Sequence, residues 1–162
     1  MIRFEVTRNR RLIEDVVKNR YVWPSIIDDS LIDPDLFIAP IDDRQFTWLV
    51  VYDDNRLLGM FMAERCNLVT YEVHTMLLRP AYGRSVDIGK GALLWAFYNL
   101  DNCKRIITEV PSFNSLADKL CRSLNLEFIG VNKLSYQLNG ILYDTKWYGV
   151  SKEDFICQQS QQ

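Results

Sequence analysis

The sequence predicts one α/β (α+β) domain with a mixed, mostly antiparallel sheet of six or seven strands and helices on both faces. Three observations predict it. The 162 residues are 48% hydrophobic, which suits a single sizeable core. Strand-like and helix-like segments are interleaved along the chain, and most neighbouring strands are joined by short turns. We expect the domain to span residues 1–157, followed by a polar tail at 158–162.

The first elements come from short patterned segments. Residues 2–6 alternate apolar and charged side chains, as in a half-buried strand. A helix is expected from residue 9 to residue 22, because apolar residues recur at helical spacing before Trp23-Pro24 stops it. Residues 25–44 are rich in Asp and Pro and predict a short helix and loops. This segment is either an ordinary acidic surface loop or a wall that attracts a cationic amine.

The middle of the chain predicts a three-stranded meander. Residues 46–52 and 57–64 form a hairpin around the turn at 53–56, and a third strand covers 71–78. A helix over 91–100 is apolar nearly all round and should be mostly buried. A strand over 104–110 then requires a parallel crossover, so the sheet is mixed.

The last elements are a helix and a hairpin. The helix begins at Ser112 or Asn114, either of which is a good N-cap. Strands over 127–136 and 141–150 follow, and Asn139-Gly140 between them is a strong hairpin signal. Trp23 and Trp48 are expected in the core.

The strand, loop and helix over residues 71–91 are the first functional candidate. We expect Gly89-Lys90-Gly91 to open the helix, where free backbone N–H groups favour a phosphate. His74, the single histidine, lies two residues after Glu72, so both side chains should leave the same face of the sheet. Either could act as a general base; a structural histidine beside an exposed carboxylate is the alternative.

Composition excludes several classes of function. The net charge of −2 and the balance of 19 basic against 21 acidic residues predict no binding to nucleic acid or anionic membranes. The four cysteines form no CxxC pair and no histidine cluster accompanies them, so we expect no metal site and reduced thiols. No signal segment or bilayer-spanning run is recognisable, which predicts a cytoplasmic protein.

The second half of the chain resembles the GCN5-related N-acetyltransferase (GNAT) superfamily. The resemblance lies in residues 106–117, IITEVPSFNSLA, which read as a strand followed by the family's N-x-x-A motif on a helix, and in residues 124–130, LNLEFIG. It covers residues 46–148 well and the N-terminal part by element order. It implies the GNAT fold and transfer of an acetyl group from acetyl-CoA to a primary amine by direct attack.

The resemblance also implies roles for individual residues. The base would be Glu72 or His74, on the strand before the loop. The acceptor would be an amine on a small molecule or a protein. Acetyl-CoA would contact the end of that strand, the loop, the start of the helix and the later Asn: Met76, Leu77, Leu78, Arg84, Ser85, Val86, Ile88, Gly89, Lys90, Gly91 and Asn114.

Three features depart from the family pattern: the loop, the place of a tyrosine and a G-F pair. Val86 stands where Gln or Arg is usual, and Asp87 brings a negative charge to the loop. Cys121 occupies the place of a tyrosine that protonates the departing thiolate in many relatives; as it lies on an apolar stripe, a core thiol is the simpler interpretation. Tyr136, Tyr143 and Tyr148 are alternative acids. Asn125 replaces the Gly of a G-F pair. These changes leave a second hypothesis, a catalytically inactive GNAT-fold binding protein.

Three short sequence segments also resemble divergent GNAT-like proteins of tailed bacteriophages: EVHT at 72–75, WAF at 95–97 and VP at 110–111. A phage protein would work in the host cytoplasm, and the inactive alternative would engage a host protein or enter the virion. An exposed final strand would permit pairing into a homodimer.

Overall fold

The protein is described by a computed structural model over residues 1–160, and its centre is a seven-stranded sheet in the order β1-β2-β3-β4-β5-β7-β6. Four helices and three short 3₁₀ turns, at Trp23–Ser25, Pro34–Leu36 and Arg79–Arg84, complete it. The strands are β1 (Ile2–Thr7), β2 (Phe46–Asp53), β3 (Arg56–Arg65), β4 (Thr70–Leu77), β5 (Arg105–Pro111), β6 (Glu127–Leu138) and β7 (Ile141–Ser151). The helices are α1 (Arg10–Val17), α2 (Ser85–Asn99), α3 (Ser115–Ser123) and α4 (Lys152–Gln159).

The predicted fold class is confirmed. Every adjacent pair of strands is antiparallel except β4 and β5, which are parallel and joined by the crossover helix α2. The β6–β7 turn is made by Asn139 and Gly140, whose φ angles of 53° and 74° suit an Asn-Gly hairpin.

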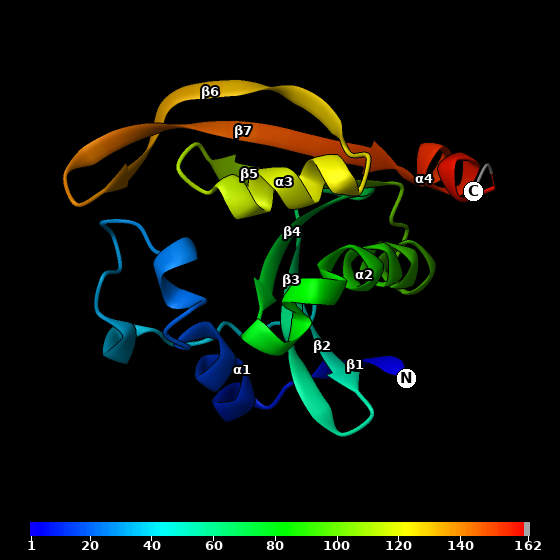
Figure 1. Ribbon diagram of the computed structural model, residues 1–162, viewed down its shortest axis with the longest axis horizontal. Coiled ribbons are helices and arrows are strands. Elements are labelled where there is room, and N and C mark those ends of the chain that lie inside the picture. Colours follow the sequence, from blue (N-terminus) through cyan, green and yellow to red (C-terminus); the bar gives the residue numbers. More distant parts are fainter. Residues whose placement is uncertain (161–162) are drawn as a thin grey trace.

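Helices cover both faces of the sheet (Figure 1). On one face, Ile13, Val16 and Val17 of α1 pack in a core that includes Trp48 and Met60. On the other face, α2 packs against Phe61, Ala63 and Tyr71 in two further cores: their α2 members are Ile88, Ala92, Leu93, Ala96 and Phe97. Trp23 and Trp48 are buried, as predicted.

Two predicted helix boundaries are wrong. Helix α1 ends at Val17, five residues before the predicted end, because Asn19 forms a turn in which its carbonyl accepts from Val22 and Trp23 N–H and its side chain accepts from Tyr21 N–H. Helix α2 begins at Ser85, six residues before Gly91, because the 3₁₀ turn at Arg79–Arg84 leads directly into it.

The glycines near the start of α2 therefore serve packing. A Cβ on Gly89 would lie 2.9 Å from the Leu124 side chain, and a Cβ on Gly91 would lie 2.8 Å from the Phe4 ring. Their lack of a side chain allows α2 to approach α3 at one point and β1 at the other.

Helix α4 was not predicted. Ser151 caps its N-terminus by accepting from Asp154 N–H, and Phe155 packs on Phe97 with ring centroids 5.6 Å apart. Residues 158 and 159 of the expected tail lie in this helix, whereas residues 161 and 162 lie outside the described part of the chain. Within residues 1–160, no helix combines the length and the hydropathy needed to cross a lipid bilayer.

Candidate active site

The site begins where β4 and β5 separate. Their parallel pairing covers three residue pairs and ends at Glu72 and Ile107, although β4 continues to Leu77 and β5 to Pro111. Leu78 N–H donates to the Leu58 carbonyl on the β3 side. Because backbone groups alternate in direction along a strand, those of Leu77, Thr75 and Val73 point into the split. Of the three cofactor contacts predicted at 76–78, Leu77 is thus the one whose backbone faces this opening.

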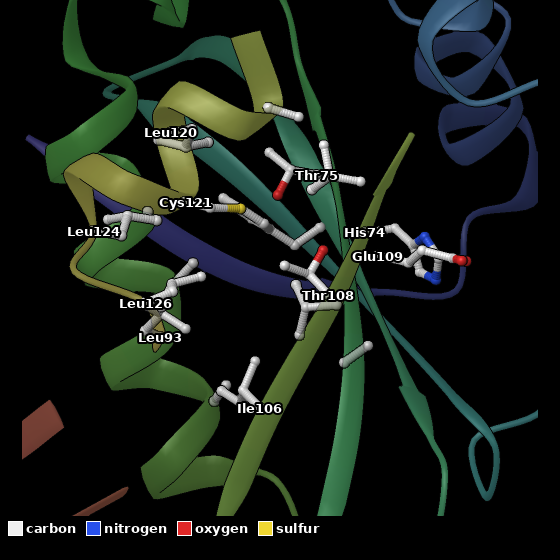
Figure 2. A pocket seen from close by; sticks show the side chains of 18 of the residues that line it. His74, Thr75, Leu93, Ile106, Thr108, Glu109, Leu120, Cys121, Leu124 and Leu126 are labelled. Carbon is white, nitrogen blue, oxygen red and sulfur yellow. The ribbon is translucent and has the colours of Figure 1, made fainter. Parts of the chain in front are cut away.

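A cavity of about 340 Å³ fills the split and reaches both faces of the sheet. Figure 2 shows side chains that line it, with Cys121 and Leu120 on one side and His74 and Glu109 on the other. A molecule bound in this cavity could therefore contact both the α2–α3 layer and the layer that contains α1.

The α2–α3 side of the cavity is apolar. Leu93 and Leu124 line it together with Cys121, whose thiol is buried and whose pKa is raised to about 11 by burial. Cys121 packs with Val110 and Tyr148, which confirms the prediction of a core thiol. Asn114 also lines the cavity, and its side chain caps α3 by accepting from Ala117 N–H at 3.1 Å, as predicted.

The opposite side carries the histidine and three Glu side chains, in addition to Asp28. Glu72 and His74 leave the same face of β4, as predicted, with 3.5 Å between Glu72 Oε1 and His74 Nε2. Glu64 on β3 is directly opposite Glu72, and Glu109 projects from β5 beside His74 (Figure 2). His74 and Glu109 line the cavity, whereas Glu72 is not one of its lining residues.

Burial and negative charge set the protonation of this group. Burial and the carboxylates of Glu109 and Glu64 raise the pKa of Glu72 to about 7. Burial lowers the pKa of His74 below its ordinary value, although Glu64 and Glu109 oppose that shift. At neutral pH His74 is therefore mainly neutral, with a free ring nitrogen that can accept a proton.

The sequence did not predict Glu109 as a site residue. Its position could have been inferred in part, because β5 was predicted to be parallel to β4 and side chains alternate along both strands. In the observed register Glu72 pairs with Ile107, so Glu109 lies two residues further along the same face. The register was the missing information.

Because α2 begins earlier than predicted, only some of the predicted phosphate contacts lie at its N-terminus. Arg84, Ser85 and Val86 lie at its N-terminus, whereas Ile88, Gly89, Lys90 and Gly91 lie inside the helix. Arg84 donates to Asp53 at 2.6 Å, and Asp87 is exposed in the first turn. The first turn of α2 thus lies at residues 85–87 rather than at the glycines, and a phosphate at the helix start would lie beside these residues.

The three candidate acids have different partners. Tyr148 donates to Asp118 at 2.7 Å, and the Tyr143 ring packs on Phe113 with centroids 4.8 Å apart. Tyr136 lines the cavity and donates to the Ile27 carbonyl.

Comparison with solved structures identifies the fold. The chain superposes on the spermidine N-acetyltransferase of Vibrio cholerae, solved with CoA and spermine, with a TM-score of 0.79, at 19% identity and over 96% of this chain and 98% of that one. The chain also superposes on a mutant form of the spermidine/spermine N-acetyltransferase of Vibrio cholerae with a TM-score of 0.78 and 17% identity. This superposition covers 98% of each chain. No family model and no curated protein sequence matches the chain. The protein thus has the mixed α/β fold of the GNAT acetyltransferases, as the sequence resemblance implied.

Proposed function

We propose that the protein is an acetyl-CoA-dependent N-acetyltransferase that acts on a primary amine. One observation carries this proposal: the cavity at the β4–β5 split joins an apolar side, under α2 and α3, to a side with a neutral histidine between carboxylates. A thioester and an amine that enter from opposite faces would meet in the sheet. The shared fold with acetyltransferases, one of them solved with CoA, supports it.

Acetyl-CoA would lie on the α2–α3 side. The backbone groups of Thr75 and Leu77 that point into the split would bond the amides of its pantetheine arm. The N–H groups of Ser85 and Val86, at the start of a 15-residue helix, would hold its pyrophosphate. Acetyl-CoA supplies the activated acetyl group of the reaction.

The amine would bind on the other side. Asp28 and Glu109 line the cavity there, and none of its described lining residues is Lys or Arg. Such a site favours a cationic amine over a neutral or anionic acceptor. The similar enzymes act on spermidine and spermine, which are cationic amines, and this agreement supports the assignment.

His74 would be the general base. The bound ammonium would first give one proton to the free nitrogen of neutral His74. The neutral amine nitrogen would then form the C–N bond to the acetyl carbon while the thioester C–S bond breaks, and the second proton released from nitrogen would go to the departing thiolate, which leaves as the free thiol of CoA. Glu72, 3.5 Å from His74, would hold the resulting imidazolium.

The test is acetyl transfer from acetyl-CoA to spermidine, followed by release of free thiol. We expect turnover in the natural protein and a loss of about 100-fold or more in His74→Ala, the typical contribution of a general base. Glu109→Gln should raise KM for the amine. Glu5→Gln is the matched control, since Glu5 lies on β1 and pairs with Arg3. Equal rates in His74→Ala and the natural protein would exclude this role.

A second candidate is a catalytically inactive binding protein. Asp87 in the first turn of α2 repels a pyrophosphate, and Arg84 is already paired with Asp53. Calorimetry with acetyl-CoA separates the candidates, because this second function predicts no binding heat at millimolar ligand. An origin in a phage, and work in the cytoplasm of its host, stay predictions that rest on the short phrases at 72–75, 95–97 and 110–111.

A further inference from the structure

Residues 25–29, here called the strap, lie against the tip of the β6–β7 hairpin at the far end of the chain. The Ile27 carbonyl accepts from Tyr136 OH, and Asp29 N–H donates to the Gln137 carbonyl at 3.0 Å. Figure 1 shows the segment that follows α1 rising to this hairpin tip. The strap lies between β1 and β2 in the chain, whereas the hairpin is formed by β6 and β7. Their contact therefore connects the two sides of the split.

Asp29 makes the most specific of these contacts. Its Oδ1 accepts from Asn139 N–H at 2.6 Å, and its Oδ2 accepts from Gly140 N–H at 2.8 Å. The two central N–H groups of a tight hairpin turn have no partner in the strand ladder, and both φ angles are positive here. One carboxylate thus satisfies two backbone donors, which is a strong, charge-assisted arrangement.

The contact lies at the acceptor side of the cavity. Ser25, Ile26 and Asp28 of the strap line the cavity, and so does Tyr136 of the hairpin. His74 and Glu109 line it as well. The strap and the hairpin tip therefore form part of the wall that an amine passes on its way to His74.

We propose that the Asp29 contact with the hairpin turn is a clasp that selects the acceptor by shape. With the clasp closed, a slender, unbranched primary amine reaches His74, whereas a branched amine or a lysine on the surface of a folded protein does not. The clasp acts by holding two loops together and does not touch the reacting atoms. This inference rests on the proposed acetyltransferase function.

The test compares acceptors of different width. Rates of acetyl transfer to 1,4-diaminobutane and to tert-butylamine are measured for the natural protein, Asp29→Ala and Tyr136→Phe. We expect Asp29→Ala to raise kcat/KM for the branched amine relative to the linear one by about tenfold, because two charge-assisted hydrogen bonds are lost. Tyr136→Phe should change the ratio in the same direction. Asp35→Ala is the matched control, since Asp35 is an exposed acid further along the same connection.

Hydrogen exchange provides a readout that does not depend on activity. The amides of Asn139 and Gly140 should exchange faster in Asp29→Ala than in the natural protein and Asp35→Ala, while those of β2 and β3 stay unchanged. Unchanged exchange together with an unchanged acceptor ratio overturns the clasp. If the natural protein acetylates no amine, the proposed function fails and the acceptor filter with it, whereas faster exchange at these amides still shows that Asp29 closes the strap.

Discussion

At the scale of single residues, the candidate base is defined by its neighbours. His74 is half-buried, and Glu64, Glu72 and Glu109 reach it from three adjacent strands. Burial favours the neutral imidazole and the carboxylates favour the charged form; burial is the larger effect, so the pKa of His74 is lowered. An imidazole that is neutral at physiological pH is in the protonation state that accepts a proton.

The acidic limb of the pH profile tests this balance. Replacing Glu64 with Gln removes a negative charge that raises the pKa values of both His74 and Glu72, so both should fall. A base with a lower pKa stays deprotonated in more acidic solution, and the acidic limb of kcat/KM should therefore move to lower pH. Glu64 does not line the cavity, so acceptor binding should change little.

Glu5→Gln serves as the control for this measurement, because Glu5 lies on β1, away from the split. Its profile should match that of the natural protein. A limb that stays in place, or moves to higher pH, in Glu64→Gln would show that another group titrates in the reaction.

At the scale of elements, α3 is fixed to β7 by one carboxylate. Asp118 accepts from Tyr148 OH at 2.7 Å, Lys146 Nζ at 2.8 Å and Arg122 Nε at 2.9 Å. These donors hold the pKa of Asp118 well below its ordinary value. The contact positions α3, and with it Asn114 and Cys121, against the split.

Asp118→Asn should destabilise the fold in a pH-dependent way. The amide group faces three donors with one oxygen, so we expect a loss of about 1–3 kcal/mol in the free energy of unfolding at pH 7. Since the folded pKa is depressed, the stabilisation is complete above about pH 4, the unfolded value, and is lost as pH falls toward the folded value. Urea denaturation at several pH values measures it.

Asp15→Asn, on the exposed side of α1, is the control and should stay within about 0.5 kcal/mol of the natural protein at every pH. A constant difference between Asp118→Asn and the natural protein, from pH 7 down to pH 3, would mean that the carboxylate charge does not stabilise α3.

Elements also show what the sequence could and could not predict. The β6–β7 hairpin followed from Asn139-Gly140, because turn chemistry is local. The start of α2 did not, because Gly89 and Gly91 looked like a phosphate loop while their partners, Leu124 and Phe4, are far away in the chain. For the same reason the sequence predicted the pairing of Glu72 with His74 on one strand but missed Glu109 and the contact of Asp29, which both depend on how distant segments meet.

At the scale of the whole molecule, the sheet consists of two halves, β1–β4 and β5–β7, held together at the centre by three residue pairs. Helices α2 and α3 join the halves on one face, where Leu124 contacts Gly89, and the strap joins them on the other. Such an architecture places the cavity between the two halves of the sheet. A ligand in the split contacts both halves and should stabilise the entire fold.

Thermal unfolding with CoA tests this coupling. Ligand at about 100 times its Kd adds about 2.7 kcal/mol to the free energy of unfolding, which should raise Tm by roughly 5–10 °C for a chain of this size. Asp87→Asn should increase the shift at a fixed CoA concentration, because it removes a negative charge from the first turn of α2, where the pyrophosphate is expected. Asp35→Asn, an exposed acid far from α2 in the chain, should behave like the natural protein. No shift in the natural protein at millimolar CoA would mean that the split does not bind it, and a shift that Asp87→Asn leaves unchanged would place the pyrophosphate away from the start of α2.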